Sequence, residues 1–133
     1  METSLAPALR KHRLYKPVKY IDDLSIAYAA ANLSICRAGA MTIAELTATG
    51  TPAIFIPYPH GAQNHQMFNA QTVAAAFAAK IIPQSALSGA ALYEEIERLL
   101  SHNFKMSQMR QQMHSLAKPL AAATLTEQLL SLG

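Results

Sequence analysis

Residues 36–46 read CRAGAMTIAEL, and this stretch decides the fold because a strand end, a tight turn and a helix start follow one another directly. The apolar residues 33–36 are typical of a buried strand, and Gly39 permits backbone angles closed to other residues. Thr42 and Glu45 have the spacing of a capping box, which predicts a helix from near Thr42. Amides at a helix start favour anions, so we expect the floor of a nucleotide-phosphate site here. From these residues alone, an ordinary strand-to-helix turn is the simpler interpretation.

The alternation of strands and helices continues on both sides of this turn. Short apolar runs predict four strands, at residues 18–21, 33–36, 53–56 and 80–82. Helices are predicted after Asp22 or Asp23, from near Thr42 to Gly50, and from about residue 65 to residue 78. Strands that alternate with helices through short connections favour a parallel sheet covered on both faces. The expected fold class is therefore α/β, a partial Rossmann-like domain with a parallel sheet of about four strands.

Three amphipathic helices are predicted after the last strand. Ser88 opens the first, whose apolar stripe consists of Leu92, Ile96, Leu99 and Leu100. The second carries methionines at positions 106, 109 and 113, a spacing typical of adaptable core rather than of a binding surface. Thr124 and Glu127 repeat the capping-box spacing and predict a terminal helix.

Length and composition predict one domain. The chain has 133 residues, of which 51% are hydrophobic, enough for one core. We expect residues 1–16 to form a loosely ordered basic segment and residues 17–133 to form the domain. Only 14% of residues are charged and the net charge is +3, which argues against a nucleic-acid partner. A cluster of basic residues lies early in the chain: Arg10, Lys11, Arg13, Lys16 and Lys19. The preferred interpretation is a solvated surface, and the alternative is contact with anionic lipid or an acidic partner.

The single cysteine and the hydropathy pattern bear on location. Cys36 cannot form an internal disulfide and suits a reducing compartment. No apolar run approaches the roughly 20 residues that span a bilayer, and the start of the chain lacks a signal-peptide core. These features predict a cytoplasmic protein whose membrane contact is at most peripheral. No cluster of His, Cys and Asp suggests a metal, and no cofactor is expected.

Three motifs in order resemble the carboxyl-terminal part of the bacterial MurG glycosyltransferases. They are IDDLSIAYAAANLSICRAGAMTIAEL at 21–46, GTPAIFIPYPHGAQNHQMFNA at 50–70 and KIIPQSALS at 80–88. The resemblance implies a GT-B enzyme of glycosyltransferase family 28, which transfers N-acetylglucosamine from UDP-N-acetylglucosamine to a lipid-linked peptidoglycan precursor. It covers the chain from about Tyr20 to the end and implies that this part binds the donor.

The resemblance also implies roles for individual residues. Backbone around Ile21 would meet the uracil, and Arg37 would pair with a phosphate or hold its loop. Glu45 would accept hydrogen bonds from the ribose hydroxyls. Residues of the turn would lie at the diphosphate and sugar: Gly39, Ala40, Met41 and Thr42. Residues of the following helix would bind the hydroxyls of N-acetylglucosamine: His65, Gln66 and Asn69.

Each of these residues also has an ordinary interpretation. In this interpretation, Glu45 only completes the capping box and Asn69 only hydrogen-bonds to buried backbone groups. His65 is then simply an exposed residue of a first helical turn. Without the resemblance these interpretations are preferred, and with it Gln66 and Asn69 gain most.

The sequence departs from the complete MurG pattern. No glycine-rich stretch such as GGSQG occurs in it, and an acceptor domain with its catalytic base is missing. We therefore expect a donor-binding portion that is inactive alone and assembles with a separate acceptor-domain chain or with itself. The alternative is a non-catalytic interaction module that associates through exposed sheet edges. A small, unrelated Rossmann-like nucleotide binder is the third option.

Overall fold

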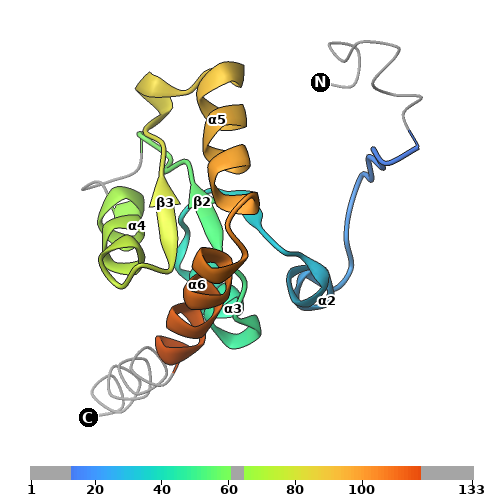
Figure 1. Ribbon diagram of the computed structural model, residues 1–133, viewed down its shortest axis with the longest axis horizontal. Helices are drawn as coiled ribbons and strands as arrows, with labels where there is room; N and C mark the ends of the chain where they lie inside the picture. Colours follow the sequence, from blue (N-terminus) through green and yellow to red (C-terminus); the bar gives the residue numbers. More distant parts are fainter. Residues whose placement is uncertain (1–12, 61–64, 118–133) are drawn as a thin grey trace.

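A computed structural model describes residues 13–60 and 65–117. Strands and helices alternate along this part of the chain (Figure 1). The strands are β1 (Ser34–Cys36), β2 (Ala53–Phe55) and β3 (Ala79–Ile81). The helices are α2 (Leu24–Ala30), α3 (Ala40–Thr49), α4 (His65–Ala75), the short 3-10 helix η3 (Gln84–Ala86), α5 (Gly89–Leu100) and α6 (Asn103–Ser115).

The sheet is parallel, with the strand order β1-β2-β3. Ile35 is paired with Ile54, and Ile54 with Lys80. The α/β fold class is thus confirmed, with three strands among the described residues rather than about four. The strand predicted at 18–21 is wrong, because this stretch is irregular and leaves Val18 65% and Tyr20 80% exposed. A short apolar run becomes a strand only where a neighbouring strand satisfies its amides and carbonyls.

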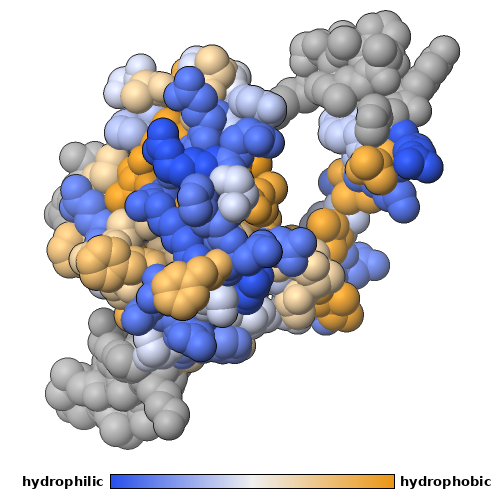
Figure 2. Space-filling model, viewed as in Figure 1, coloured by the Kyte–Doolittle hydropathy of each residue, from blue (hydrophilic) through white to orange (hydrophobic). Residues whose placement is uncertain are grey.

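Helices cover both faces of the sheet. On one face, Phe55 of β2 packs with Ile43 and Leu46 of α3 and with Val73 of α4. On the other face, the sheet is covered by α5 and α6 through the cluster of Ile54, Ile82, Leu99, Met106 and Met109. The methionine stripe predicted as core is confirmed, since Met106, Met109 and Met113 are buried. Polar side chains cover the outer face of α5 (Figure 2).

The helix starts agree with the sequence in two cases and differ in one. The side chain of Asp23 accepts from the Ser25 amide at 3.0 Å, and Ser88 accepts from the Ala91 amide at 3.0 Å, as predicted. The capping box of Thr42 and Glu45 is wrong. Helix α3 begins at Ala40, so Thr42 is already inside the helix and cannot cap it.

Two helix ends use the left-handed conformation. Gly50 ends α3 with φ 67°, as predicted for a glycine, and an added Cβ would overlap the ring of His114 on α6. Helix α4 ends at Ala75, earlier than predicted, in a Schellman turn with Phe77 at φ 61°. Its two bonds run from the Phe77 amide to Ala74 and from the Ala78 amide to Val73. The capping pair predicted at 124 and 127 lies outside the described residues.

Candidate functional site

Two connections meet at the carboxyl edge of the sheet. The turn at residues 37–39 follows β1, and the loop at residues 56–60 follows β2. Because β1 and β2 are parallel neighbours, both connections leave the sheet at the same edge. Ligands of open parallel sheets bind at this edge, so the turn predicted from the sequence lies in the expected place.

The first turn of α3 has amides without a capping side chain. Gly39 is the N-cap and no side-chain cap bond forms, while the first intrahelical bond runs from the Ile43 amide to the Gly39 carbonyl at 3.0 Å. The amides of Ala40, Met41 and Thr42 therefore have no partner within the helix. They stand at the positive end of a ten-residue helix, an arrangement that suits an anion.

Gly39 does not use its conformational freedom, which corrects one sequence expectation. Its φ is −70° and its ψ is 150°, angles open to any residue. An added Cβ would have its nearest neighbours, Gln66 Nε2 and Thr42 Oγ1, at 3.9 Å. The fold therefore accommodates a side chain here, and what glycine offers is the close approach of a ligand to the backbone.

Gln66 and Asn69 of α4 bind both polar backbone groups of the buried Ala38. The Ala38 amide donates to Gln66 Oε1 at 3.2 Å, and Asn69 Nδ2 donates to the Ala38 carbonyl at 3.1 Å. Gln66 Oε1 also accepts from the Tyr58 amide at 2.8 Å. These bonds tie α4 to both connections at the sheet edge. They leave Gln66 Nε2 on the side of Gly39.

Arg37 holds the loops after β2 and β3 together. Its Nη1 donates to the Ile56 carbonyl at 3.2 Å and to Gln84 Oε1 at 2.6 Å. Its guanidinium lies 5.7 Å from the centre of the Tyr58 ring, within range of a cation–π contact. Of the two predicted roles for Arg37, the geometry favours holding the loop.

Tyr28 of α2 connects three residues of the site. Burial is the main cause that raises the pKa of Tyr28, and the charges of Cys36 and Glu45 raise it further, while a hydrogen bond with Thr42 lowers it. Thr42, Glu45 and Cys36 are therefore the groups that act on the Tyr28 hydroxyl. Burial likewise raises the pKa of the Cys36 thiol.

The other predicted residues are less tightly grouped. Met41 projects from the first turn of α3 and is 80% exposed, and His65 is the exposed first residue of α4. Ile21 is 40% exposed in the irregular segment before α2, and no described hydrogen bond joins it to the turn after β1. The structure thus brings together the turn, α3 and α4, and leaves Ile21 apart.

A pocket of about 450 Å³ lies beside these residues at the same edge. Its walls come from the loop after β2, the first turn of α4 and the start of η3, including Tyr58, Met67 and Gln84. Sequence reasoning missed Tyr28, Tyr58 and Gln84. The sequence did hold a signal for Tyr58 and Gln84, since each is next to a proline that directly follows an apolar strand.

The described residues lack two other features, a metal-binding cluster and a helix that could span a membrane. They contain no group of three or more His, Cys, Asp or Glu side chains that could hold a metal ion. No helix in residues 13–60 and 65–117 is both long and apolar enough to cross a membrane.

The chain belongs to glycosyltransferase family 28. Residues 4–125 match the model of the "Glycosyltransferase family 28 C-terminal domain", which confirms the class predicted from the motifs. Within this class the similarity is to MurG. The crystal structure of Acinetobacter baumannii MurG matches with a TM-score of 0.68 and 34% identity, over 74% of this chain and 28% of that chain. A glycosyltransferase of kitacinnamycin, 20% identical with a TM-score of 0.55 over 78% of this chain and 27% of its own, shares the fold alone.

Similar sequences carry one descriptive name, "UDP-N-acetylglucosamine--N-acetylmuramyl-(pentapeptide) pyrophosphoryl-undecaprenol N-acetylglucosamine transferase". The protein of Pseudomonas aeruginosa (strain LESB58) is 40% identical over 114 residues, 86% of this chain and 32% of the relative. That of Halothermothrix orenii is 43% identical over 124 residues, 93% of this chain and 33% of the relative. This chain thus spans about a third of the length of these relatives.

Proposed function

We propose that this chain binds UDP-N-acetylglucosamine as the donor-binding part of a glycosyltransferase. The observation that carries the proposal is the uncapped first turn of α3, which presents the amides of Ala40, Met41 and Thr42 beside Gln66. The names of the relatives supply the donor and the acceptor, a pyrophosphoryl-undecaprenol lipid.

The diphosphate is the part of the donor that the α3 amides suit. The positive end of the helix stabilises an anion, and it stabilises UDP more as negative charge builds up when the sugar bond breaks. In this proposal the half-buried carboxylate of Glu45 accepts hydrogen bonds from the ribose diol. Gln66 donates to the sugar through Nε2, because its Oε1 already accepts from two backbone amides.

Two of the predicted ligand contacts, those of Asn69 and Arg37, become positioning roles under this proposal. Asn69 acts by positioning, since its amide group holds the Ala38 carbonyl. Arg37 also acts by positioning, through Ile56 and Gln84. Contact of uracil with Ile21 and of the sugar with His65 stay predictions.

Calorimetric titration with UDP, UMP and UDP-N-acetylglucosamine tests the proposal. UDP should bind more tightly than UMP, because the second phosphate reaches the α3 amides. Glu45→Gln should weaken UDP binding by about tenfold, the loss of one charge-assisted pair of hydrogen bonds. The matched control is Glu94→Gln on the exposed surface of α5, which should leave the affinity unchanged. A folded chain that binds none of the three nucleotides contradicts the proposal.

The open edge of β1 favours a second candidate function, association with another chain. The Ser34 amide donates to Pro52 and the Cys36 carbonyl accepts from Ile56, so the backbone groups of Ile35 between them face away from β2. The Ile35 side chain is 42% exposed. An edge that no strand among the described residues pairs with can accept a further strand. Sedimentation of the wild type and of Ile35→Lys tests it: association that the lysine abolishes supports the module, and a monomer in both cases refutes it.

Activity, partners and location follow from the donor proposal. We expect no transfer by this chain alone, because the acceptor hydroxyl needs a base that the donor site does not supply. Activity should return when a chain carrying an acceptor domain is added. The cytoplasmic location and the boundary between residues 16 and 17 stay predictions, and residues 1–12 lie outside the described part of the chain.

A further inference from the structure

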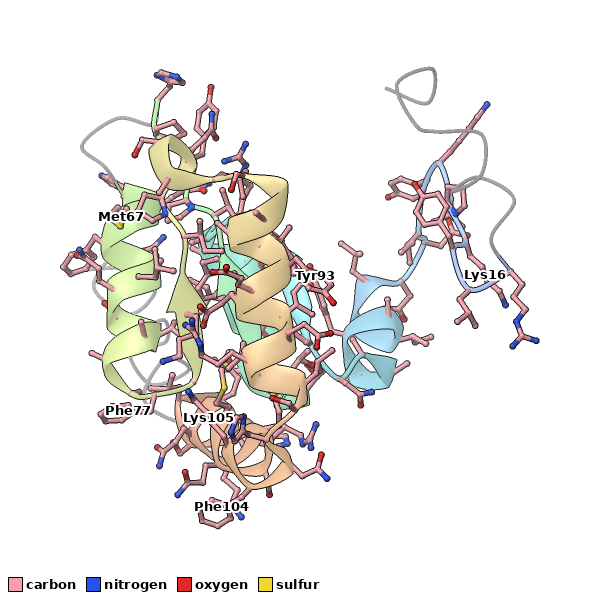
Figure 3. All side chains as sticks on the ribbon, turned by 45° about the horizontal axis from the view of Figure 1, so that its top comes forward. Lys16, Met67, Phe77, Tyr93, Phe104 and Lys105 are labelled. Carbon is pink, nitrogen blue, oxygen red and sulfur yellow. The ribbon has the colours of Figure 1, made fainter. Side chains whose placement is uncertain are left out.

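A second pocket, of about 140 Å³, lies between α4, β3 and α6. Its lining combines two lysines with apolar and amide side chains: Ala74, Phe77, Ala79, Lys80, Lys105, Gln108 and Met109. It is at the end of the molecule opposite the donor site. Figure 3 shows Phe77 and Lys105 at this end, and Met67 of the donor-side pocket at the other.

Both lysines reach the pocket from one face of the sheet. Lys80 is paired with Ile54 in the sheet register, so its side chain stands on the face covered by α5 and α6. Lys105 is in the first turn of α6, and both lysines are half-buried. Neither makes an ion pair or hydrogen bond with another described residue. Two cationic groups therefore line one pocket without an anionic partner among residues 13–60 and 65–117.

The pocket lining contains no acidic side chain, and Glu94, Glu95 and Glu97 of the neighbouring α5 do not line it. None of the seven lining residues is acidic, and α4, β3 and α6 contain no Asp or Glu. The charged side chains of the lining are therefore both positive, and half-buried charges are screened by salt less than exposed ones.

Phe77 provides an independent reason to expect a ligand. It is the one residue other than glycine with positive φ in the described part of the chain, and its ring is 78% exposed. Glycine fits the left-handed position of a Schellman turn better, so Phe77 brings backbone strain while burying little of its ring. Phe104, 77% exposed, projects at the same end of the molecule (Figure 3). Strain at an exposed aromatic residue beside unpaired lysines is typical of a functional site.

We infer that this pocket binds a phosphate group, with Lys80 and Lys105 as its cationic ligands and Phe77 as an apolar wall. The phosphate comes either from a free phosphate compound or from the headgroup of an anionic phospholipid. In the second case Phe77 and Phe104 enter the interfacial layer of the bilayer. A simpler role exists for Lys80 alone, since a lysine on an edge strand opposes pairing with other chains. It does not explain Lys105, which is on a helix.

The test uses the whole chain with UDP in excess, so that the donor turn is occupied. Calorimetry measures inorganic phosphate and pyrophosphate, and sedimentation measures vesicles of phosphatidylglycerol against vesicles of phosphatidylcholine. Lys105→Ala and Lys80→Ala should each weaken binding by about tenfold, the value of one charge-assisted contact. The matched control is Arg110→Ala, which removes an exposed charge from the same helix outside the pocket and should change binding less than twofold.

Phe77→Gly separates the two sources of phosphate and also reports on the fold. It should raise Tm by a few degrees, because the strained position then holds a glycine. It should abolish vesicle binding if the ligand is a phospholipid, and leave ion binding nearly unchanged if the ligand is a free phosphate. The inference is overturned if neither ions nor anionic vesicles bind, or if Arg110→Ala weakens binding as much as Lys105→Ala.

Discussion

Replacing Gln66 by alanine should destabilise the fold as well as weaken donor binding. The change removes one oxygen that accepts from two amides, Ala38 at 3.2 Å and Tyr58 at 2.8 Å. Ala38 is fully buried, so its amide loses its partner without easy access to water, which costs about 1–3 kcal/mol. Tyr58 is exposed and its amide can turn to water, so its loss adds about 1 kcal/mol or less. The free energy of unfolding should therefore fall by roughly 1–4 kcal/mol.

Urea titration followed by circular dichroism measures this change, with Gln71→Ala as the matched control. Gln71 is the same residue type on the same helix, but it is exposed and makes no described side-chain hydrogen bond. Its replacement should alter the free energy of unfolding by no more than about 0.5 kcal/mol. Equal midpoints for the two alanine variants would refute the role assigned to Gln66.

Gln66→Glu separates the structural role from the binding role. A carboxylate accepts from the Ala38 and Tyr58 amides as an amide oxygen does, and an acid in the first turn of α4 suits the helix dipole. Stability should therefore stay within about 0.5 kcal/mol of the wild type. UDP binding should nevertheless be lost, because the Nε2 donor is gone and a negative charge faces the phosphates. Retained UDP affinity would show that the donor does not reach this side chain.

Three further outcomes are expected. Gly39→Ala should leave the urea midpoint unchanged, because its φ of −70° suits any residue, yet weaken UDP binding in calorimetry, because the methyl group obstructs the backbone. Gly50→Ala should lower the free energy of unfolding by about 1–3 kcal/mol in the same urea assay, because φ 67° disfavours alanine and the Cβ meets His114. Burial raises the pKa of Cys36 from 9.0, and that of Tyr28 is raised from 10.0, so both hold their protons to higher pH in the fold than when unfolded. The free energy of unfolding should thus be constant below about pH 9 and fall as the pH rises above about 9. The urea midpoints at about pH 8 and about pH 10 should differ less in Cys36→Ala than in the wild type.

Local signals in the sequence were enough for most of the fold. Asp23 and Ser88 cap helices because the cap bond joins residues two or three positions apart, so the spacing itself carries the information. The methionines of α6 were identified as core because helical periodicity alone places them on one face.

Failures arose where structure depends on residues distant in the chain. Residues 18–21 have the composition of a strand, but no neighbouring strand pairs with them. Thr42 and Glu45 have the right spacing for a cap, yet α3 begins two residues earlier, next to Ala38, whose amide and carbonyl bond to Gln66 and Asn69, 28 and 31 positions away. The family motif predicted a ligand-binding role for Gln66 and Asn69. It did not reveal that both side chains also hydrogen-bond to the backbone of Ala38.

The two bonds to Ala38 restrict how the site can move. One helix holds both the amide and the carbonyl of the same residue, so the turn after β1 cannot shift without displacing α4 or breaking both bonds. Any rearrangement of this turn is then a displacement of a whole helix rather than a fluctuation of a short connection. Amide exchange at Ala38 should accordingly be as slow as in the core of α4.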